Sequence, residues 1–468
     1  MHQAERRATR GVPALVVGAP SSGTGKTTVA LGLVAALRAR GLVVGACKVG
    51  PDYLDTGYHA TASGRPAANL DLWMSGEDGV RAAFGRAARG ADVVVVEGVM
   101  GLFDGHRDGS PSSTADVARV LGAPVVLVLD ASKSAASLGA LALGFSTFDE
   151  RVQLVGVIAN RFRAGRERGP VERGLARAAV PALGWLPSAG DIALPERHLG
   201  LVLAEEDRAR TERALASLGE LVEAHVDVEA LLRLASSAVA ASDPPAAAAP
   251  RARIAVARDD AFAFYYEGSL AALEAAGAEL VAFSPLRDAA PPDVDGLYLG
   301  GGYPELHAEA LAANASMREA VRAAVLGGMP TYAECGGMMY LGEELMDAGG
   351  RAWPMAGALP LRTHMHERVQ AVGYREGVLR ADGVLGRAEE RVRAHEFRYS
   401  TAERTGDFAA AYDVVDVRGE SVAEGFASAT LLASYLHLDL GGAPGLAGRF
   451  VDSCVAARAV TTTERRPA

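Results

Sequence analysis

Cysteine is scarce in this sequence of 468 residues, which contains only Cys47, Cys335 and Cys454. The three lie far apart, with no Cys-x-x-Cys pair and no Cys/His cluster at metal-ligand spacing. A disulfide framework and a zinc module are therefore excluded as the basis of the fold. Each cysteine must instead be either a small buried apolar residue or a reactive thiol.

Long apolar runs and an excess of basic residues are also absent. No stretch reaches the ~18 consecutive apolar residues of a membrane-spanning helix. The basic start, MHQAERRATRG, precedes an apolar stretch that is too short for a signal peptide. We therefore expect a cytoplasmic protein with no membrane partner. The net charge of −10, with acidic and basic residues interspersed, argues against nucleic acid as a partner.

Length and one low-complexity stretch divide the chain. A single hydrophobic core stops growing near ~250–300 residues, so a chain of this length is expected to form two domains. Residues 236–252, SSAVAASDPPAAAAPRA, lack hydrophobic periodicity and contain consecutive prolines, which is typical of a linker. We predict a first domain over residues 1–235 and a second domain over residues 253–460.

Apolar runs of strand length alternate with helical stretches in both halves. Their apolar residues are continuous rather than alternating, which indicates parallel strands buried on both faces. We therefore predict the α/β class, with two doubly wound domains. The runs are 13–20, 42–49, 91–97, 123–130 and 152–160 in the first half, and 253–259, 280–285, 295–302 and 329–335 in the second.

A phosphate-binding loop is predicted at residues 18–28, GAPSSGTGKTT. An apolar strand leads into it, and the helical pattern of residues 25–41 leads out, which is the context that such a loop needs. The match to the strict pattern is imperfect, because Pro20 stands where that pattern has glycine. The segment GTGKTT and its context nevertheless indicate nucleotide binding.

The residues of this loop have separate tasks. Gly23 and Gly25 let the backbone approach an anion, and the N–H groups of the first helical turn, which includes Thr28, point toward it. Lys26 can reach the β- and γ-phosphates of ATP, and the Thr27 hydroxyl can bind Mg²⁺.

Polar residues follow several predicted strands of the first half. Because ligands bind at the carboxyl ends of parallel strands, Asp52 and Glu97 are expected to join Thr27 in holding Mg²⁺. We also expect Asn160 to contact the nucleotide base. Simpler roles stay open: Asp52 could shape the turn after Pro51, Glu97 could form a cap or an ion pair, and Asn160 could be a turn residue.

Cys335 ends a predicted strand and precedes the helix-like segment GGMMYLGEEL. A nucleophile at a sharp strand-to-helix turn is a known solution in hydrolases. The helix N-terminus is expected to lower the pKa of the thiol and so favour the thiolate. Backbone N–H groups of Gly336, and of Gly301 in the segment LYLGGGYPE, could form an oxyanion hole.

His437 is the candidate base for this nucleophile. It lies in a β-like run, LLASYLHLDL (431–440), and Asp439 follows two residues later. Residues at this spacing in a strand point the same way, so Asp439 could orient the imidazole. A single histidine at a strand end is usually structural, but a cysteine, a histidine, an acid and two glycine turns together favour catalysis.

Several motifs together resemble one family over nearly the whole chain. ECGGMMYLGEEL, GGGYPELHAEAL and SYLHLDL resemble the class I glutamine amidotransferases found in cobalamin-pathway synthetases. GAPSSGTGKTTVALGLVAAL, KVGPDYLDTGYH and VVEGVMGLFDG resemble the ATPase half of the same enzymes, which is related to dethiobiotin synthetase. Within this group the motifs look most like those of the cobyrinic or hydrogenobyrinic acid a,c-diamide synthases.

The resemblance implies a ligase that uses ATP and L-glutamine. Its substrate would be a corrinoid polycarboxylate, hydrogenobyrinate or cobyrinate, whose a and c acetate groups are amidated through acyl phosphates. Cys335 and His437 match the nucleophile and base that release ammonia from glutamine. The positions that match a substrate site are Lys48, Tyr53, Leu54 and Asp104.

Two departures and three alternatives stay open. Asp439 stands where the usual class I triad has glutamate, and Arg398 replaces a histidine in the segment HEFRYS. Arg398 could meet a substrate carboxylate or lie on the surface.

Three other functions are alternatives to an a,c-diamide synthase. They are cobyric acid synthase, nickel-sirohydrochlorin a,c-diamide synthase and an ATPase switch with an inactive amidotransferase domain. The sequence decides neither the metal in the ring nor whether the chain forms a homodimer.

Overall fold

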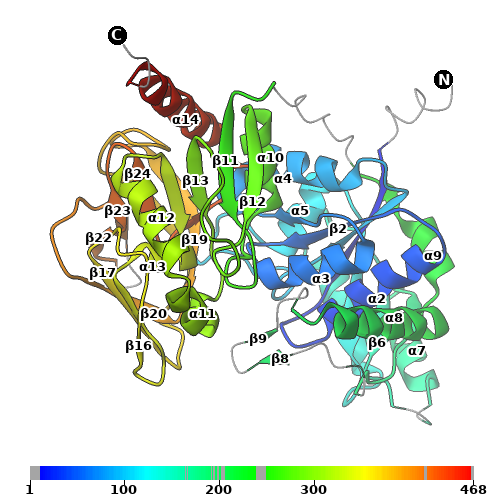
Figure 1. The fold of residues 1–468 in the computed structure, drawn as a ribbon. Coiled ribbons are helices and arrows are strands. Elements are labelled where there is room, and N and C mark those ends of the chain that lie inside the picture. The colour runs from blue at the N-terminus through cyan, green and yellow to red at the C-terminus, as the bar shows by residue number, and fades with distance from the viewer. Residues whose placement is uncertain are drawn as a thin grey trace. The chain divides into compact units, whose positions relative to one another are not determined.

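The chain divides into two compact units, Met1–Pro244 and Pro245–Ala468 (Figure 1). The computed structural model describes residues 11–163, 165, 167–190, 192, 196–197, 200–201, 206–238, 249–415 and 419–464. Residues 239–248 of the predicted linker lie outside this described part. The predicted domain boundaries stay a prediction, although residues 236–237 form a strand that pairs with the sheet of the first unit.

An eight-stranded sheet forms the centre of the first unit, in the order β3-β2-β4-β1-β5-β6-β7 with β10 beside β1. All pairs are parallel except β1–β10. The continuous apolar runs therefore form the buried parallel strands that the sequence predicts. The strands are β1 (Pro13–Gly18), β2 (Val44–Val49), β3 (Ala68–Leu70), β4 (Val93–Glu97), β5 (Val125–Asp130), β6 (Leu154–Asn160), β7 (Ala182–Trp185) and β10 (Ser236–Ser237).

Helices cover both faces of this sheet, so the unit has two apolar cores. Val16 and Val94 belong to one core, and their neighbours Leu15 and Val95 belong to the other, as alternation along a strand requires. The first core is closed by α4 (Leu72–Ala88), α5 (Thr114–Leu121), α6 (Ser137–Thr147) and α7 (Gly169–Arg177). The second is closed by α2 (Lys26–Ala39), α3 (Tyr53–Ser63), α8 (Arg208–His225) and α9 (Val228–Leu234). A short antiparallel pair, β8 (Glu196–Arg197) and β9 (Gly200–Leu201), lies outside the sheet.

The second unit has a six-stranded central sheet, in the order β12-β11-β13-β14-β24-β23. Its strands are parallel except for β23. The doubly wound arrangement predicted for this half is confirmed, because apolar cores lie on both faces. The strands are β11 (Ala252–Ala257), β12 (Ala278–Phe283), β13 (Gly296–Leu299), β14 (Thr331–Glu334), β23 (Phe426–Ala427) and β24 (Leu431–Ser434).

Helices of several lengths surround this sheet. The longest, α14 (Pro444–Glu464), contributes Phe450 and Val451 to the core that also contains Tyr332. The others are α10 (Glu267–Ala275), the 3₁₀ helix η1 (Pro304–His307), α11 (Ala308–Ala313), α12 (Ala315–Leu326) and α13 (Gly336–Leu341).

Two further sheets in the second unit were not predicted. One has the order β16-β15-β17-β20 and the other β22-β21-β18-β19-β25. Most of their strands alternate between buried and exposed residues and lack the continuous apolar runs on which the prediction rested. Their bounds are β15 (Glu344–Met346), β16 (Ala352–Pro354), β17 (Leu361–Met365), β18 (Ala371–Leu379), β19 (Arg391–Arg398), β20 (Ser400–Arg404), β21 (Tyr412–Val415), β22 (Ser421–Glu424) and β25 (His437–Leu438).

The run 431–440, predicted as one β-like segment, is divided between two sheets. Its first part, β24, lies in the central sheet beside β14. Its second part, β25, pairs with β19 in the five-stranded sheet, where His437 stands opposite His395. The chain thus carries His437 away from the plane of the central sheet.

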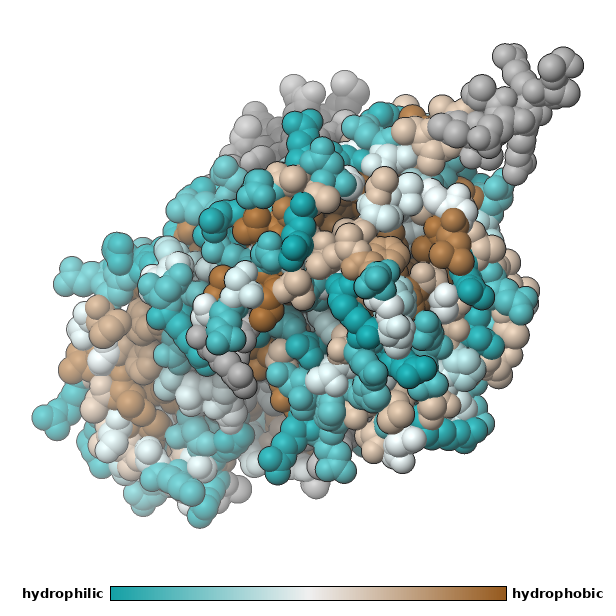
Figure 2. All heavy atoms as spheres, turned by 90° about the vertical axis from the view of Figure 1, so that its left-hand side faces the viewer, coloured by the Kyte–Doolittle hydropathy of each residue, from teal (hydrophilic) through white to brown (hydrophobic). Residues whose placement is uncertain are grey.

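The helices of the described residues differ from membrane spans in length or in polarity. No helix there is both long and apolar enough to cross a bilayer. On the face shown in Figure 2, hydrophilic side chains are spread widely and apolar residues form small groups between them.

Candidate functional site

The phosphate loop of the first unit joins β1 to α2, as predicted. Gly25 is the N-cap of α2, and Thr28 lies in the first helical turn. The buried Lys26 folds back over the loop: its Nζ donates to the carbonyl oxygens of Ser21, at 3.1 Å, and Met100, at 2.5 Å. Burial and the nearby Lys48 ammonium lower the pKa of Lys26. These two acceptors are neutral carbonyl oxygens, which an anionic phosphate can replace.

Glu97 ends β4 and is fully buried. Oε1 accepts hydrogen bonds from the Thr27 hydroxyl, at 2.6 Å, and from Lys48 Nζ, at 2.7 Å. Oε2 lies 2.6 Å from Nε2 of His59. Burial alone would raise the pKa of Glu97, but Lys48 and His59 hold it below its ordinary value. The predicted residues Thr27, Lys48 and Glu97 are therefore in direct contact.

Lys48 connects two carboxyl groups. Besides Glu97, its Nζ contacts Oδ2 of Asp55 at 2.5 Å. Burial would lower the pKa of Lys48, but these two carboxylates raise it above its usual value. Burial and the charge of Glu97 raise the pKa of Asp55 to about 6, against the opposing effect of Lys48. The site thus contains a fixed ammonium flanked by two carboxyl groups.

His59 was missed by the sequence reasoning. The signal that could have found it is its spacing from Asp55, because residues four apart share one face of a helix. That face of α3 points toward the ends of β2 and β4, where both side chains reach the cluster.

Asp52 lies at the start of α3, directly after Pro51. It is the N-cap of α3, and its Oδ1 accepts the N–H of Asp55 at 2.8 Å. Tyr53 and Leu54 follow in the first helical turn and are half-buried. In the part of the chain that the structure describes, no group of three or more His, Cys, Asp or Glu side chains has the geometry of a metal site. A role for Asp52 in metal binding stays a prediction.

Asn160 and Asp104 both lie beside the phosphate loop. Nδ2 of Asn160 donates to the carbonyl oxygen of Thr24 at 2.9 Å. Asp104 accepts the N–H of Gly101 at 3.0 Å, in a segment that is tied to the loop by a hydrogen bond from Leu102 to Ala19. The oxygen of Gly23 accepts a hydrogen bond from Arg161. These contacts place Asn160 and Asp104 at the loop, and their ligand contacts stay predictions.

Cys335 forms the turn between β14 and α13, as predicted. Its φ of 46° and ψ of −103° lie outside the favoured regions for a residue with a side chain. Such strain persists only where the surrounding structure imposes it, and it is common at active sites. Sγ lies 3.8 Å from the carbonyl oxygen of Phe397, which belongs to β19. The turn therefore presents the sulfur toward a second sheet.

Two glycine segments meet at this turn. A Cβ atom on Gly337 would lie 2.1 Å from the oxygen of Leu299, and one on Gly336 would lie 3.1 Å from the nitrogen of Gly302. Only glycine permits the approach at Gly337. A Cβ on Gly301 would lie 2.5 Å from Cε1 of His437. The predicted residues Cys335, Gly336, Gly301 and His437 are thus brought together.

The thiol and the imidazole are both uncharged in this arrangement. Burial and the charge of Glu305 raise the pKa of Cys335 to about 12. Burial and the neighbouring His395 lower the pKa of His437 to about 3. The expectation that the helix N-terminus lowers the pKa of the thiol is therefore wrong, because α13 has only six residues and burial dominates.

A glutamate that the sequence reasoning missed faces His437. Glu334 is buried, and its Oε2 lies 4.0 Å from Nδ1 of His437. Its position directly before Cys335 was the available signal. Oδ1 of Asp439 accepts the N–H of Gly441 at 2.9 Å. The role predicted for Asp439 stays a prediction.

Arg398 is held inside the second unit. Its Nε donates to Glu396 at 2.6 Å, and its guanidinium lies over the ring of Tyr435, 4.6 Å from the centroid. Glu396 also pairs with Arg375 at 2.8 Å. This packing does not fit the alternative of a simple surface arginine.

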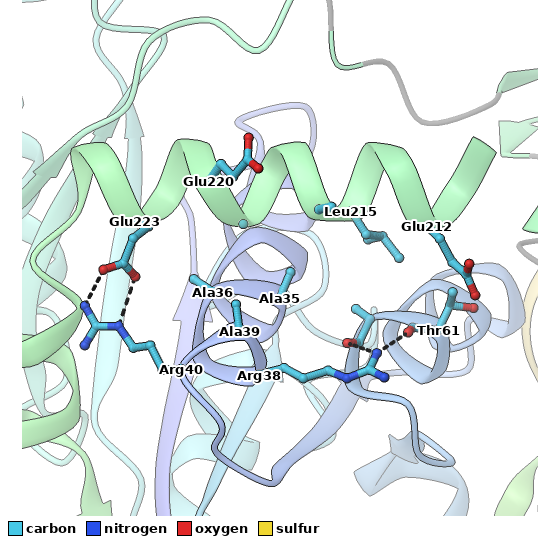
Figure 3. A pocket seen from close by; sticks show the side chains of 13 residues that line it. Ala35, Ala36, Arg38, Ala39, Arg40, Thr61, Glu212, Leu215, Glu220 and Glu223 are labelled. Carbon is cyan, nitrogen blue, oxygen red and sulfur yellow. Dashed lines mark hydrogen bonds and ion pairs between the residues drawn. The ribbon is translucent and has the colours of Figure 1, made fainter. Parts of the chain in front are cut away.

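A groove between α2, α3 and α8 lies away from these residues (Figure 3). Arg38 donates to the carbonyl oxygens of Thr61 and Ala62, and Arg40 makes two hydrogen bonds to Glu223. None of the predicted site residues lines this groove.

Both halves of the chain match known domain families. Residues 15–202 match the CobQ/CobB/MinD/ParA nucleotide binding domain, and residues 253–444 match the CobB/CobQ-like glutamine amidotransferase domain. A cobyrinate a,c-diamide synthase from Syntrophotalea carbinolica is 44% identical and covers 94% of this chain and 98% of its own length. The chain belongs to the a,c-diamide synthase family.

Other a,c-diamide synthases agree with this assignment. A hydrogenobyrinate a,c-diamide synthase from Rhodobacter capsulatus is 44% identical over 92% of this chain and 100% of its own length. One from Streptomyces coelicolor is 41% identical over 95% of this chain and 98% of its own. A solved glutamine amidotransferase covers 43% of this chain and 98% of its own, at 18% identity and a TM-score of 0.32. The predicted resemblance to a,c-diamide synthases is confirmed.

The raised pKa of Cys335 predicts how the free protein reacts with iodoacetamide. Because only the thiolate reacts, and the pKa is near 12, the labelling rate should rise about tenfold per pH unit between pH 7 and pH 10. Peptide mass spectrometry measures the rate for each cysteine. Cys47 and Cys454 are fully buried, so their labelling reports unfolding.

A rate of Cys335 labelling that levels off between pH 6 and pH 8 would contradict this account. It would show that a thiolate–imidazolium pair already exists in the resting protein.

Proposed function

We propose that this chain amidates the a and c acetate groups of cobyrinate or hydrogenobyrinate, using ATP and nitrogen from L-glutamine. The observation that carries the proposal is the pairing of two sites in one chain. One unit holds Cys335 at a strained turn, with His437 against the adjoining glycine segment, and the other holds a predicted phosphate loop beside a buried ion-pair cluster. The names of the relatives supply the substrate class.

Glutamine hydrolysis begins at Cys335. Since the thiol is protonated at neutral pH, His437 takes the proton while the sulfur attacks the side-chain amide carbon. Backbone N–H groups near Gly301 and Gly336 stabilise the negative oxygen. The imidazolium then protonates the departing nitrogen, so ammonia leaves and a thioester remains. His437 next removes a proton from water, which hydrolyses the thioester and releases glutamate.

The first unit activates the acid. A ring carboxylate attacks the γ-phosphorus of ATP, and ADP leaves as an acyl phosphate forms. Lys26 stabilises the charge on the transferred phosphoryl group. Ammonia attacks the acyl carbon, loses a proton and expels phosphate, because phosphate is a far better leaving group than hydroxide. The second acetate group is amidated in the same way.

Magnesium fits the oxygen donors of the first unit. Thr27 and Glu97 lie 2.6 Å apart and offer a hydroxyl and a carboxylate, which are hard ligands of the kind Mg²⁺ prefers. With Asp52 as a further ligand, they would hold a Mg²⁺ ion. When bound, the ion would neutralise charge on the β- and γ-phosphates. The relatives include both cobyrinate and hydrogenobyrinate enzymes, so both rings are candidate substrates.

Replacing the nucleophile separates the two half-reactions. Cys335→Ala should abolish amidation with glutamine and leave amidation with ammonium chloride within about twofold of wild type, because ammonia enters after the missing step. Product is measured by mass spectrometry with each ring as substrate. Cys335→Ser, which is nearly isosteric with cysteine, is made as a second variant and should behave in the same way. Failure of ammonia to rescue both variants would overturn the two-site scheme.

Removing the charge of Glu97 should affect both nitrogen sources. Glu97→Gln is expected to slow amidation with glutamine and with ammonia on the order of 100-fold, because the phosphoryl-transfer site loses its central carboxylate. Glutamine hydrolysis without ATP should continue. Glu229→Gln, at an exposed residue paired with Arg40 in the same unit, is the matched control. Normal turnover in Glu97→Gln would remove Glu97 from the site.

The two roles of Asp52 are separable. Asparagine caps a helix as well as aspartate does, so Asp52→Asn should leave the melting temperature unchanged. If Asp52 binds the metal, the variant should bind ATP more weakly than wild type in the presence of Mg²⁺ and equally without it. Calorimetry measures both affinities. An unchanged affinity with Mg²⁺ would limit Asp52 to the cap of α3.

A further inference from the structure

Glu334 is a buried carboxyl group that precedes the candidate nucleophile in sequence and faces the candidate base in space. It is the last residue of β14, and Cys335 follows it directly. Only 1% of its surface is exposed. Its Oε2 accepts a hydrogen bond from the hydroxyl of Tyr298 at 3.0 Å, and its Oε1 accepts one from the hydroxyl of Tyr332. The acid is therefore held by two side chains from neighbouring strands of the central sheet.

A tyrosine layer supports this carboxyl group. The rings of Tyr298 and Tyr332 stack with centroids 5.0 Å apart, and Tyr265 meets Tyr298 edge to face. The hydroxyl of Tyr265 accepts the N–H of Gly300 at 2.9 Å, at the start of the glycine turn. The same layer thus fixes both Glu334 and the backbone beside Gly301.

Glu334 also fixes the segment that carries His437. Oε1 accepts the backbone N–H of Leu438 at 3.0 Å, across 104 positions of sequence. Oε2 lies 4.0 Å from Nδ1 of His437, and the edge of the ring lies against Gly301. A carboxyl group on the Nδ1 side leaves Nε2, on the opposite side of the imidazole, for the thiol and the leaving nitrogen. A separation of 4.0 Å is too long for a hydrogen bond, but catalytic hydrogen bonds are often long or poorly aligned in free enzymes and tighten with substrate.

Burying the carboxyl group of Glu334 is unfavourable unless its contacts compensate for the lost hydration. Burial raises the pKa of Glu334 to about 7, although three donors oppose the shift. A buried carboxyl group is costly compared with an apolar side chain of similar volume. The tyrosine hydroxyls reduce that cost by donating to the carboxyl group, which itself faces the imidazole.

We propose that Glu334 is the acid that positions His437, through the backbone of Leu438 and through Nδ1 of the imidazole. It takes the task that the usual class I triad gives to the acid two residues after the histidine. Asp439, which occupies that position here, caps the turn at Gly441. The inference rests on the proposed hydrolysis of glutamine by Cys335 and His437.

The test uses three variants of the full chain. Glu334→Gln keeps the shape and removes the charge, and it should lower kcat for glutamine hydrolysis by about 100-fold or more, as loss of a triad acid does. KM for glutamine should stay within about twofold, because Glu334 acts through His437 and does not touch substrate. Glu334→Asp should restore part of kcat. Asp439→Asn, the third variant, tests the competing acid: if Glu334 is the positioning residue, its loss of kcat should be clearly smaller than that of Glu334→Gln.

Protein that has lost its fold is recognised within the same samples. Cys454 is fully buried in the same unit, so its labelling by iodoacetamide measures the unfolded fraction. The proposal predicts a kcat loss in Glu334→Gln while Cys454 stays protected and synthesis from ammonia stays normal.

Two results would overturn the proposal alone: a kcat of Glu334→Gln near that of wild type, or a loss matched by Cys454 labelling in both Glu334 variants. An equal or larger loss in Asp439→Asn would return the role to Asp439. A wild-type chain that does not hydrolyse glutamine would contradict the proposed function, and the inference with it.

Discussion

In each unit a buried glutamate ends a parallel strand, and the groups that satisfy it belong to the candidate site. Glu97 ends β4 and is paired by Thr27, Lys48 and His59. Glu334 ends β14 and is held by two tyrosines and the backbone of Leu438. Leaving a buried carboxyl group without its hydrogen-bond or ionic partners costs about 1–3 kcal/mol or more, so each glutamate constrains the elements that contact it. The phosphate loop and α3 are fixed around one, and the glycine turn and β25 around the other.

The two units share a parallel-sheet architecture, but different groups hold the buried glutamate of each unit. The parallel sheet supplies the same edge in both, where strands end and loops can hold polar groups. In the first unit the cluster is ionic, with Lys48 between Asp55 and Glu97, and Thr27 joins it to the phosphate loop. In the second unit the side-chain donors are neutral hydroxyls, and burial raises the pKa of the Cys335 thiol and lowers that of the His437 imidazole.

Much of the fold and of the candidate site could be predicted from local sequence. The predictions that failed concern features that depend on contacts between distant parts of the chain. Continuous apolar runs predict buried parallel strands, and the segments GTGKTT and ECGG place Lys26 and Cys335 at turns, because these signals are local. The division of 431–440 between two sheets depends on pairing with β19, which is far away in sequence. His59 and Glu334 were missed for the same reason, since their roles are set by partners on other elements. The direction of the Cys335 pKa shift was wrong because burial depends on the whole second unit.

The most direct test follows the nitrogen. The chain is given ATP, cobyrinate or hydrogenobyrinate, and glutamine labelled with ¹⁵N in the side-chain amide, in a buffer with a small excess of unlabelled ammonium. Mass spectrometry then measures the label in the product. The account predicts that both new amide groups carry ¹⁵N, with one ADP formed for each. Unlabelled diamide, or hydrolysis of ATP and glutamine without any amidated ring, would contradict it.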